Sequence, residues 1–169
     1  KGAGACKASA ASVDLYERTA ALVDIDAERF YVVDLFAVNG GEQRDQSWHG
    51  PLVPVQPPDL DWQEQGGGTL AGPGVEQFAK YTDKWGRTAT NFPCYLANIR
   101  RATLDGPAVW SWDYGLPEGD RLNLHVIPLG GPMEMIMGTV RSPARPDAWG
   151  LDYVLARRRA RVEEPSLFL

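Results

Sequence analysis

Short runs of alternating apolar and polar residues recur along the chain, and Gly, Pro, Asn or Asp bounds each of them. In RLNLHVIPL, for example, Leu122, Leu124 and Val126 share one strand face, whereas Asn123 and His125 lie on the other. A helical period of about 3.6 residues is almost absent. The pattern predicts an all-β fold, an antiparallel β-sandwich with little helix, formed as a single domain or part of one. We expect strands at Val13–Ile25, Phe30–Val38, Ser47–Val53, Tyr95–Leu104, Ala108–Tyr114, Arg121–Ile127, Glu134–Val140 and Leu151–Ala156.

One long stretch breaks this pattern. Between Pro54 and Phe92 the sequence is rich in Pro and Gly and has no clear period. A structureless loop of this length is uncommon in a compact domain unless it is functional or packs on its own aromatic residues. We therefore expect an ordered loop excursion that lies over one face or edge of the sandwich. Its expected anchors are Trp62, Phe78, Tyr81 and Trp85.

The segment YVVDLFAVNGGEQRDQSWHG, residues 31–50, starts as a strand and then changes character. Asn39-Gly40-Gly41 is a turn signal, and the polar and aromatic residues after it are denser than a plain hairpin needs. We predict that this region is mainly a structural corner, in which a buried Asp34 or Asp45 accepts hydrogen bonds from backbone amides or from Arg44. The predicted corner residues are Asp34, Gly40, Gly41 and Asp45.

A histidine and several tryptophans are the other candidates for function. His49 follows Trp48 and precedes a Gly-Pro pair, so it either approaches a ligand or is held by hydrogen bonds in a turn. Trp48 and Trp85 have loop-like neighbours, and we expect both to be exposed. Trp110 and Trp112 of VWSWDY share one strand face, a spacing that favours packing in the core over a sugar-binding platform.

Composition and charge narrow the class of protein. The 169 residues are 44% hydrophobic and 23% charged, which is the balance of a folded protein. The net charge of −5 argues against nucleic-acid binding. No apolar run is long enough for a membrane span. We interpret the basic cluster Arg157, Arg158, Arg159 and Arg161 as a solvated strand end.

The two ends of the sequence have their own pattern. The chain starts with Lys1 instead of Met and stops in EEPSLFL, an apolar run typical of a shortened strand. We interpret the chain as a piece of a longer protein. The lack of a signal peptide in this piece therefore gives no information about the cellular compartment. Cys6 and Cys94 are far apart in the sequence, and we leave open whether they pair in an exported parent protein.

The usual catalytic signatures are missing from the sequence. It has no G-x-S-x-G elbow, no phosphate-binding loop, no H-E-x-x-H and no Cys pair at zinc spacing. With only His49 and His125, the chain alone cannot build a histidine-rich metal site. We therefore expect no cofactor or metal in this chain and assign no catalytic residue to it.

Five segments, taken in order, resemble one known family. The first is ERFYVVDLFAVNGGEQRDQSWHGPL, an aromatic-rich strand ending in Val-Asp-Leu-Phe, followed by a Gly-Gly turn and a polar run that closes on His-Gly. The others are GGGTLAGPGVEQF, YLANIRRATLDGPAVWSWDY, RLNLHVIPL and LDYVLARRR. They are similar to stretches of the C-terminal β-domain of heparinase II/III-like proteins, and together they span nearly the whole chain.

This resemblance implies a secreted or periplasmic polysaccharide lyase with an α/α toroid upstream of a β-sandwich. Such enzymes cleave uronic-acid polysaccharides by β-elimination, in which the C5 proton is abstracted and the uronate charge is neutralised. The family's catalytic residues lie mostly on the toroid, and its metal-binding His-x-His segment lies upstream of the matched part. We expect this chain to support the active site and to be inactive alone. Its expected partners are an acidic polysaccharide and the upstream domain of the same protein, with no nucleic acid and no membrane span.

The chain departs from the family at one place. Where the family often has His-Asp-Tyr, this sequence has Arg44-Asp45-Gln46. An arginine cannot act as a neutral base or bind a metal, but it can hold a carboxylate. The candidates for substrate binding are Arg44, Trp48, His49 and Trp85. The alternative function is a non-catalytic carbohydrate-binding or purely structural β-sandwich module. A toroid domain and a His-x-His strand upstream of this chain would support the lyase, and their absence would support the alternative.

Overall fold

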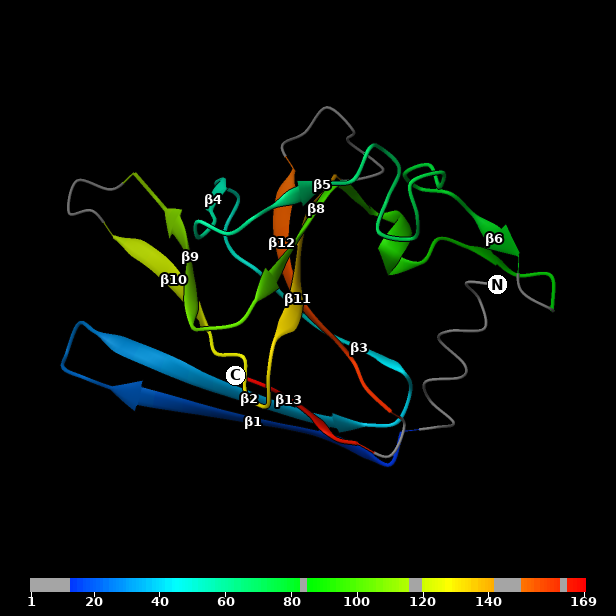
Figure 1. The fold of residues 1–169 in the computed structure, drawn as a ribbon. Helices are drawn as coiled ribbons and strands as arrows, with labels where there is room; N and C mark the ends of the chain where they lie inside the picture. Colours follow the sequence, from blue (N-terminus) through cyan, green and yellow to red (C-terminus); the bar gives the residue numbers. More distant parts are fainter. Residues whose placement is uncertain (1–12, 83–84, 116–119, 142–149, 162–163) are drawn as a thin grey trace.

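The regular secondary structure of the described residues consists almost entirely of antiparallel strands (Figure 1). In the part of the chain that is described, the one helical element is the short 3₁₀ turn Phe92–Cys94. The all-β fold with little helix that the sequence predicts is thus confirmed. The computed structural model describes residues 13–82, 85–115, 120–141, 150–161 and 164–169.

The first sheet is a long hairpin with a short third strand. Strand β1 (Leu15–Asp24) pairs along its whole length with β2 (Phe30–Asn39). Strand β13 (Ser166–Phe168) pairs with the other edge of β2 and confirms the strand pattern of EEPSLFL. Figure 1 shows this sheet along the lower side of the molecule. The strand order β1-β2-β13 leaves β1 at an edge.

Two further sheets complete the sandwich, with strand orders β3-β12-β11-β8-β5 and β10-β9-β4. The strands of the five-stranded sheet are β3 (Gln43–His49), β5 (Gln63–Glu64), β8 (Leu96–Leu104), β11 (Met133–Val140) and β12 (Leu151–Arg159). The strands of the three-stranded sheet are β4 (Val55–Gln56), β9 (Ala108–Asp113) and β10 (Arg121–Val126). A separate small hairpin pairs β6 (Tyr81–Thr82) with β7 (Thr88–Ala89).

The main core lies between these three sheets. Trp110 and Trp112 of β9 are almost completely buried, which confirms that they pack in the core. Phe36 of the hairpin and Phe168 of β13 stack with ring centroids 5.9 Å apart. The sheets are therefore held together by side chains that each of them contributes. The buried members are Phe36, Val38, Val55, Leu104, Trp110, Trp112, Val126, Met133, Met135, Met137, Val154, Ala156 and Phe168.

The middle of the excursion between Pro54 and Phe92 packs on the opposite face of the five-stranded sheet, whereas its start, with Val55, reaches the main core. Leu70 and Thr69 of this segment are buried. Leu70 belongs to a second cluster, whose other members are Leu96, Ile99, Ile136 and Leu155. The segment is an ordered cover, as expected, and it also carries strands β4 to β7. Each of these strands has two residues, too few for an alternating pattern to mark them in the sequence.

The predicted anchors of the excursion differ in burial. Trp62 packs against the main core, and its indole N–H donates to a backbone carbonyl within the excursion at 3.1 Å. The ring of Phe78 meets that of Tyr95 edge-on, with centroids 5.7 Å apart. Tyr81 is half-buried in β6. Trp85 is 54% exposed, so its predicted role as an anchor is wrong.

Candidate functional site

Strand β3 divides the dense polar segment between two faces of the sheet. The strand spans Gln43–His49 and begins earlier than the predicted Ser47–Val53 strand. Successive residues of a strand point to opposite faces. Arg44, Gln46 and Trp48 consequently point toward the core, whereas Gln43, Asp45, Ser47 and His49 are exposed on the outer face. The segment predicted to be a corner is thus the edge strand of the five-stranded sheet, paired with β12.

Arg44 joins the β2–β3 turn to a distant part of the chain. Its side chain is buried, with Nε donating to the carbonyl oxygens of Gly40 at 3.1 Å and Gly41 at 3.2 Å. Nη1 donates to Ser166 Oγ at 2.9 Å and to the Glu164 carbonyl. Buried guanidinium groups need such acceptors. This placement gives Arg44 a structural role and leaves its predicted role in substrate binding without support.

Gly40 and Gly41 make that turn possible. Both have positive φ, at 98° and 71°, a backbone conformation that favours glycine. The Asn39 side chain also accepts a hydrogen bond from the Gly40 amide at 2.9 Å. The predicted turn lies where the sequence placed it, and Arg44 binds the two glycine carbonyls.

Asp45 forms an ion pair across the outer face of the sheet. Arg157 of β12 lies directly opposite and donates from Nε to Oδ1 at 2.7 Å and from Nη2 to Oδ2 at 2.8 Å. Arg157 Nη1 is also 3.9 Å from Glu134 Oε2, and Glu134 Oε1 accepts a hydrogen bond from Arg101 at 3.1 Å. Burial lowers the pKa of Arg157, but the hydrogen bond to Asp45 and the charges of Asp45 and Glu134 raise it above its ordinary value. Four strands are thereby linked by alternating charges.

Asp34 lies in the middle of β2 and not at the turn. Its carboxylate accepts two hydrogen bonds of 2.7 Å from Arg18 of β1. The hydrogen bond and the charge of Asp34 raise the pKa of Arg18. Since the Arg18 side chain is 58% exposed, this is a pair at the surface of the hairpin. The predicted pairing of Asp34 with Arg44 is wrong. The Arg44 guanidinium lies at the turn after β2, where it donates to backbone carbonyls.

His49 lies in an exposed aromatic cluster on the outer face. Its ring centroid is 5.0 Å from that of Tyr153, the residue directly opposite on β12. Tyr153 in turn meets Phe92 of the 3₁₀ turn edge-on at 5.4 Å. His49 and Phe92 are both exposed, and Tyr153 is half-buried between them. His49 Nδ1 is 3.4 Å from the Gly50 carbonyl, so the ring contacts both a turn and an open surface.

The two candidate tryptophans lie apart from this cluster. Trp48 points to the inner face and packs against the main core, so the expectation that it is exposed is wrong. Trp85 is exposed, as expected, in the connection between β6 and β7. The guanidinium of Arg87 lies over its ring at 4.9 Å from the centroid. The structure places neither tryptophan in the cluster of His49, Tyr153 and Phe92.

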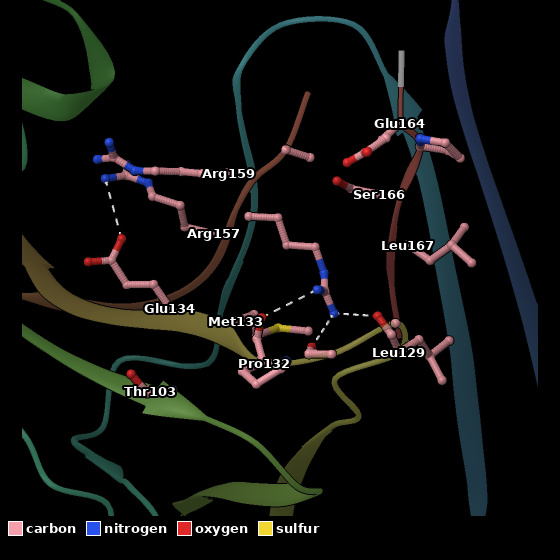
Figure 2. A pocket seen from close by; sticks show the side chains of 15 residues that line it. Thr103, Leu129, Pro132, Met133, Glu134, Arg157, Arg159, Glu164, Ser166 and Leu167 are labelled. Carbon is pink, nitrogen blue, oxygen red and sulfur yellow. Dashed lines mark hydrogen bonds and ion pairs between the residues drawn. The ribbon is translucent and has the colours of Figure 1, made fainter. Parts of the chain in front are cut away.

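A hollow of about 770 Å³ opens at the end of β12 (Figure 2). Arg157, Arg158 and Arg159 line it together with the β10–β11 connection. Arg158 points across the hollow and donates to the carbonyls of Leu129, Pro132 and Gly131, the last at 2.9 Å. Burial lowers the pKa of Arg158. Of the four arginines interpreted as a solvated strand end, Arg159 and Arg161 are exposed, Arg158 is half-buried and Arg157 is buried. The interpretation therefore holds for two of them and is wrong for Arg157 and Arg158.

Sequence reasoning found His49 but missed Tyr153 and Phe92. No motif marks them, because their contact with His49 depends on the β3–β12 register and on the path of the excursion. Among the described residues no three His, Cys, Asp or Glu side chains gather where they could hold a metal ion. Cys94 is buried, and Cys6 lies outside the described residues.

Comparisons with models of known families, with curated proteins and with solved structures find no match to this chain. No helix in the described ranges has the length and apolarity needed to cross a membrane.

Proposed function

We propose that the chain is the later part of the β-sandwich domain of a heparinase II/III-like polysaccharide lyase, exported to the periplasm or secreted. In this function its outer sheet face contacts an acidic polysaccharide and supports an active site on an upstream domain. The five ordered sequence segments that resemble the family support this proposal. Two of them contain β3 and β12, whose pairing brings His49 and Tyr153 together.

The observation that carries the proposal is the exposed cluster of His49, Tyr153 and Phe92. Flat rings stack on the apolar faces of sugars, and an imidazole adds a hydrogen-bonding group at neutral pH. Arg159 lies six residues after Tyr153 on the same face of β12, which corresponds to roughly 20 Å along a strand. An exposed guanidinium at that distance suits the carboxylate of a bound uronan.

The experiment compares two exposed histidines. Binding of heparin, heparan sulfate and alginate oligosaccharides is measured by calorimetry for the parent protein and for its His49→Ala and His125→Ala variants. His125 lies on the outer face of β10, in a different sheet, and is the matched control. We expect His49→Ala to weaken binding on the order of tenfold, about 1.4 kcal/mol, and His125→Ala to leave it unchanged. Equal effects of the two substitutions would exclude the cluster as the binding surface.

Formation of the unsaturated uronate product tests the lyase chemistry separately from binding. We expect product from the parent protein, less product from His49→Ala at an unchanged melting temperature, and none from the 169-residue chain alone. Oligosaccharide binding by the parent without any product would favour the alternative, a non-catalytic carbohydrate-binding module. The same aromatic cluster would serve that module, since stacking requires no catalytic group.

A further inference from the structure

Strand β1 is a long edge strand with few of the features that usually protect such an edge. Its ten residues pair with β2 in one uninterrupted register, without a bulge. It contains no proline and no lysine, and Glu17 and Arg18 are the only charged residues before its last position. Edges of this kind commonly pair with another strand.

The backbone groups that β1 turns outward can be assigned. The Ile25 amide donates to the Arg29 carbonyl at 2.9 Å, so the backbone of Ile25 is turned toward β2 at this end of the hairpin. Hydrogen-bonded pairs alternate along an antiparallel ladder. The odd-numbered residues of β1 therefore bond to β2. The even-numbered residues, among them Ala20, direct their N–H and C=O groups to the open edge.

The side chains along this edge include large exposed apolar groups. Tyr16 is 75% exposed and Leu22 is 65% exposed, and both lie on the face of the hairpin that carries Phe36. The Tyr16 ring already meets Phe36 of the core edge-on, at 5.0 Å between centroids. Exposed apolar groups beside an open strand edge mark an interaction surface.

We propose that β1 pairs antiparallel with β1 of a second copy of this chain, with Thr19 on the twofold axis. In this register Tyr16 lies opposite Leu22 of the other copy, and Leu15 lies opposite Val23. Tyr16 and Leu22 then cover each other and extend the core cluster of Phe36 across the junction.

The same register is compatible with the backbone and with the charges in the middle of the strand. Outward-facing even residues meet even residues, as hydrogen-bonded pairs require. Arg18 faces Ala20 and Glu17 faces Ala21, so like charges oppose each other only at the two ends of the pairing, where Asp24 faces Asp14 of the other copy. A symmetric pairing of identical strands is the isologous contact that closes a dimer. This inference stands independently of the proposed enzymatic function.

The first experiment removes one outward amide. Ala20→Pro deletes an N–H that the isolated hairpin does not use, and proline is tolerated at such edge positions. By sedimentation equilibrium we expect the wild-type chain at twice its mass of 18.6 kDa and the variant at that mass, with the same circular-dichroism spectrum. Leu22→Lys is expected to separate the copies too, whereas Val109→Lys, at an exposed apolar position of β9, leaves them paired. A monomeric wild type, or a dimer that survives both β1 substitutions, would overturn the proposal.

The second experiment reads the register. Thr19 opposite Thr19 is a non-hydrogen-bonded pair, with Cα atoms about 4.5 Å apart and within the range of a disulfide. In a Cys6→Ser background we expect Thr19→Cys to form an intermolecular disulfide on mild oxidation. Ala21→Cys should form none, because Ala21 faces Glu17 and lies roughly 13 Å from its own copy. The reverse result would refute the register.

Discussion

Arg157 of β12 and Asp45 of β3 lie directly opposite each other and share two hydrogen bonds, of 2.7 and 2.8 Å. The Arg157 side chain is 7% exposed and that of Asp45 is 29% exposed. The pair therefore lies at the boundary between the covered centre of the five-stranded sheet and its open edge. Besides the strand ladder, it fixes the edge strand that carries His49.

Replacing Arg157 by alanine should show how much this pair contributes to the free energy of unfolding. It removes the two guanidinium donors of Asp45 and a neighbour of Glu134, and breaking a fully buried pair typically costs roughly 3–5 kcal/mol. Because Asp45 is partly solvated, we expect a smaller loss of about 2–3 kcal/mol in the free energy of unfolding in urea. Arg159→Ala, on the same face but exposed, should change it by less than ~0.5 kcal/mol. Equal losses for both variants would contradict this account.

The Asp34→Ala substitution should lower the free energy of unfolding only slightly. A buried carboxylate with lost hydrogen bonds would cost about 1–3 kcal/mol. The pair of Asp34 with the largely exposed Arg18 is instead a surface ion pair, for which we expect about 0.2–1 kcal/mol. A double-mutant cycle with Arg18→Ala measures the coupling energy of the two side chains directly. A coupling energy well above ~1 kcal/mol at physiological salt would show that the pair is shielded from solvent and would contradict this prediction.

Gly50→Ala should destabilise the protein by steric conflict. A Cβ at Gly50 would lie 2.4 Å from Cε2 of the buried Trp112, and neither the backbone nor the core indole can move freely. Overpacking of this kind costs about 1–3 kcal/mol. Gly106→Ala is the control, since no heavy atom outside its neighbours lies within 4 Å of a Cβ there. Thermal melting of the two variants should separate them, and similar melting temperatures would disprove the conflict.

The β1–β2 turn should show a pH dependence of defined sign. Hydrogen bonds from the Arg29 side chain, then from the backbone amides of Glu28 and Arg29, lower the pKa of Asp26. A carboxyl whose pKa is lower in the folded state stabilises the fold above its ordinary pKa, and this contribution is lost as the pH falls through the folded pKa. An NMR titration should find the Asp26 pKa below its ordinary value, with Arg29→Gln raising it. No change in that variant would reject the assignment.

The strands of the core were readable from the sequence where apolar residues alternate. Strand β10, with Leu124 and Val126 turned to the core, is an example. Strand β3 was misplaced because its inward positions are Arg44 and Gln46, which carry no apolar signal. The buried guanidinium of Arg44 is satisfied by carbonyls of residues some 120 positions away, and no local pattern encodes such acceptors.

The candidate site was predictable only in part, for a related reason. His49 stands out because the sequence has only two histidines and this one lies beside a turn. Its neighbours Tyr153 and Phe92 come from a strand over a hundred residues later and from the end of the excursion. Their convergence depends on strand pairing, which alternation alone does not define, because it marks faces and not partners.

The hydrogen bonds of Arg44 have a consequence for the order of folding. Strand β13 completes the sheet that β1 and β2 begin, and Arg44 Nη2 donates to the Arg161 carbonyl at 2.8 Å. During synthesis the hairpin therefore leaves the ribosome long before the residues that satisfy Arg44 and cover Phe36 exist. Closing so large a loop is slow compared with local pairing. Until those residues are made, the apolar face of the nascent hairpin stays uncovered, and transiently exposed apolar surface of this kind is prone to aggregation.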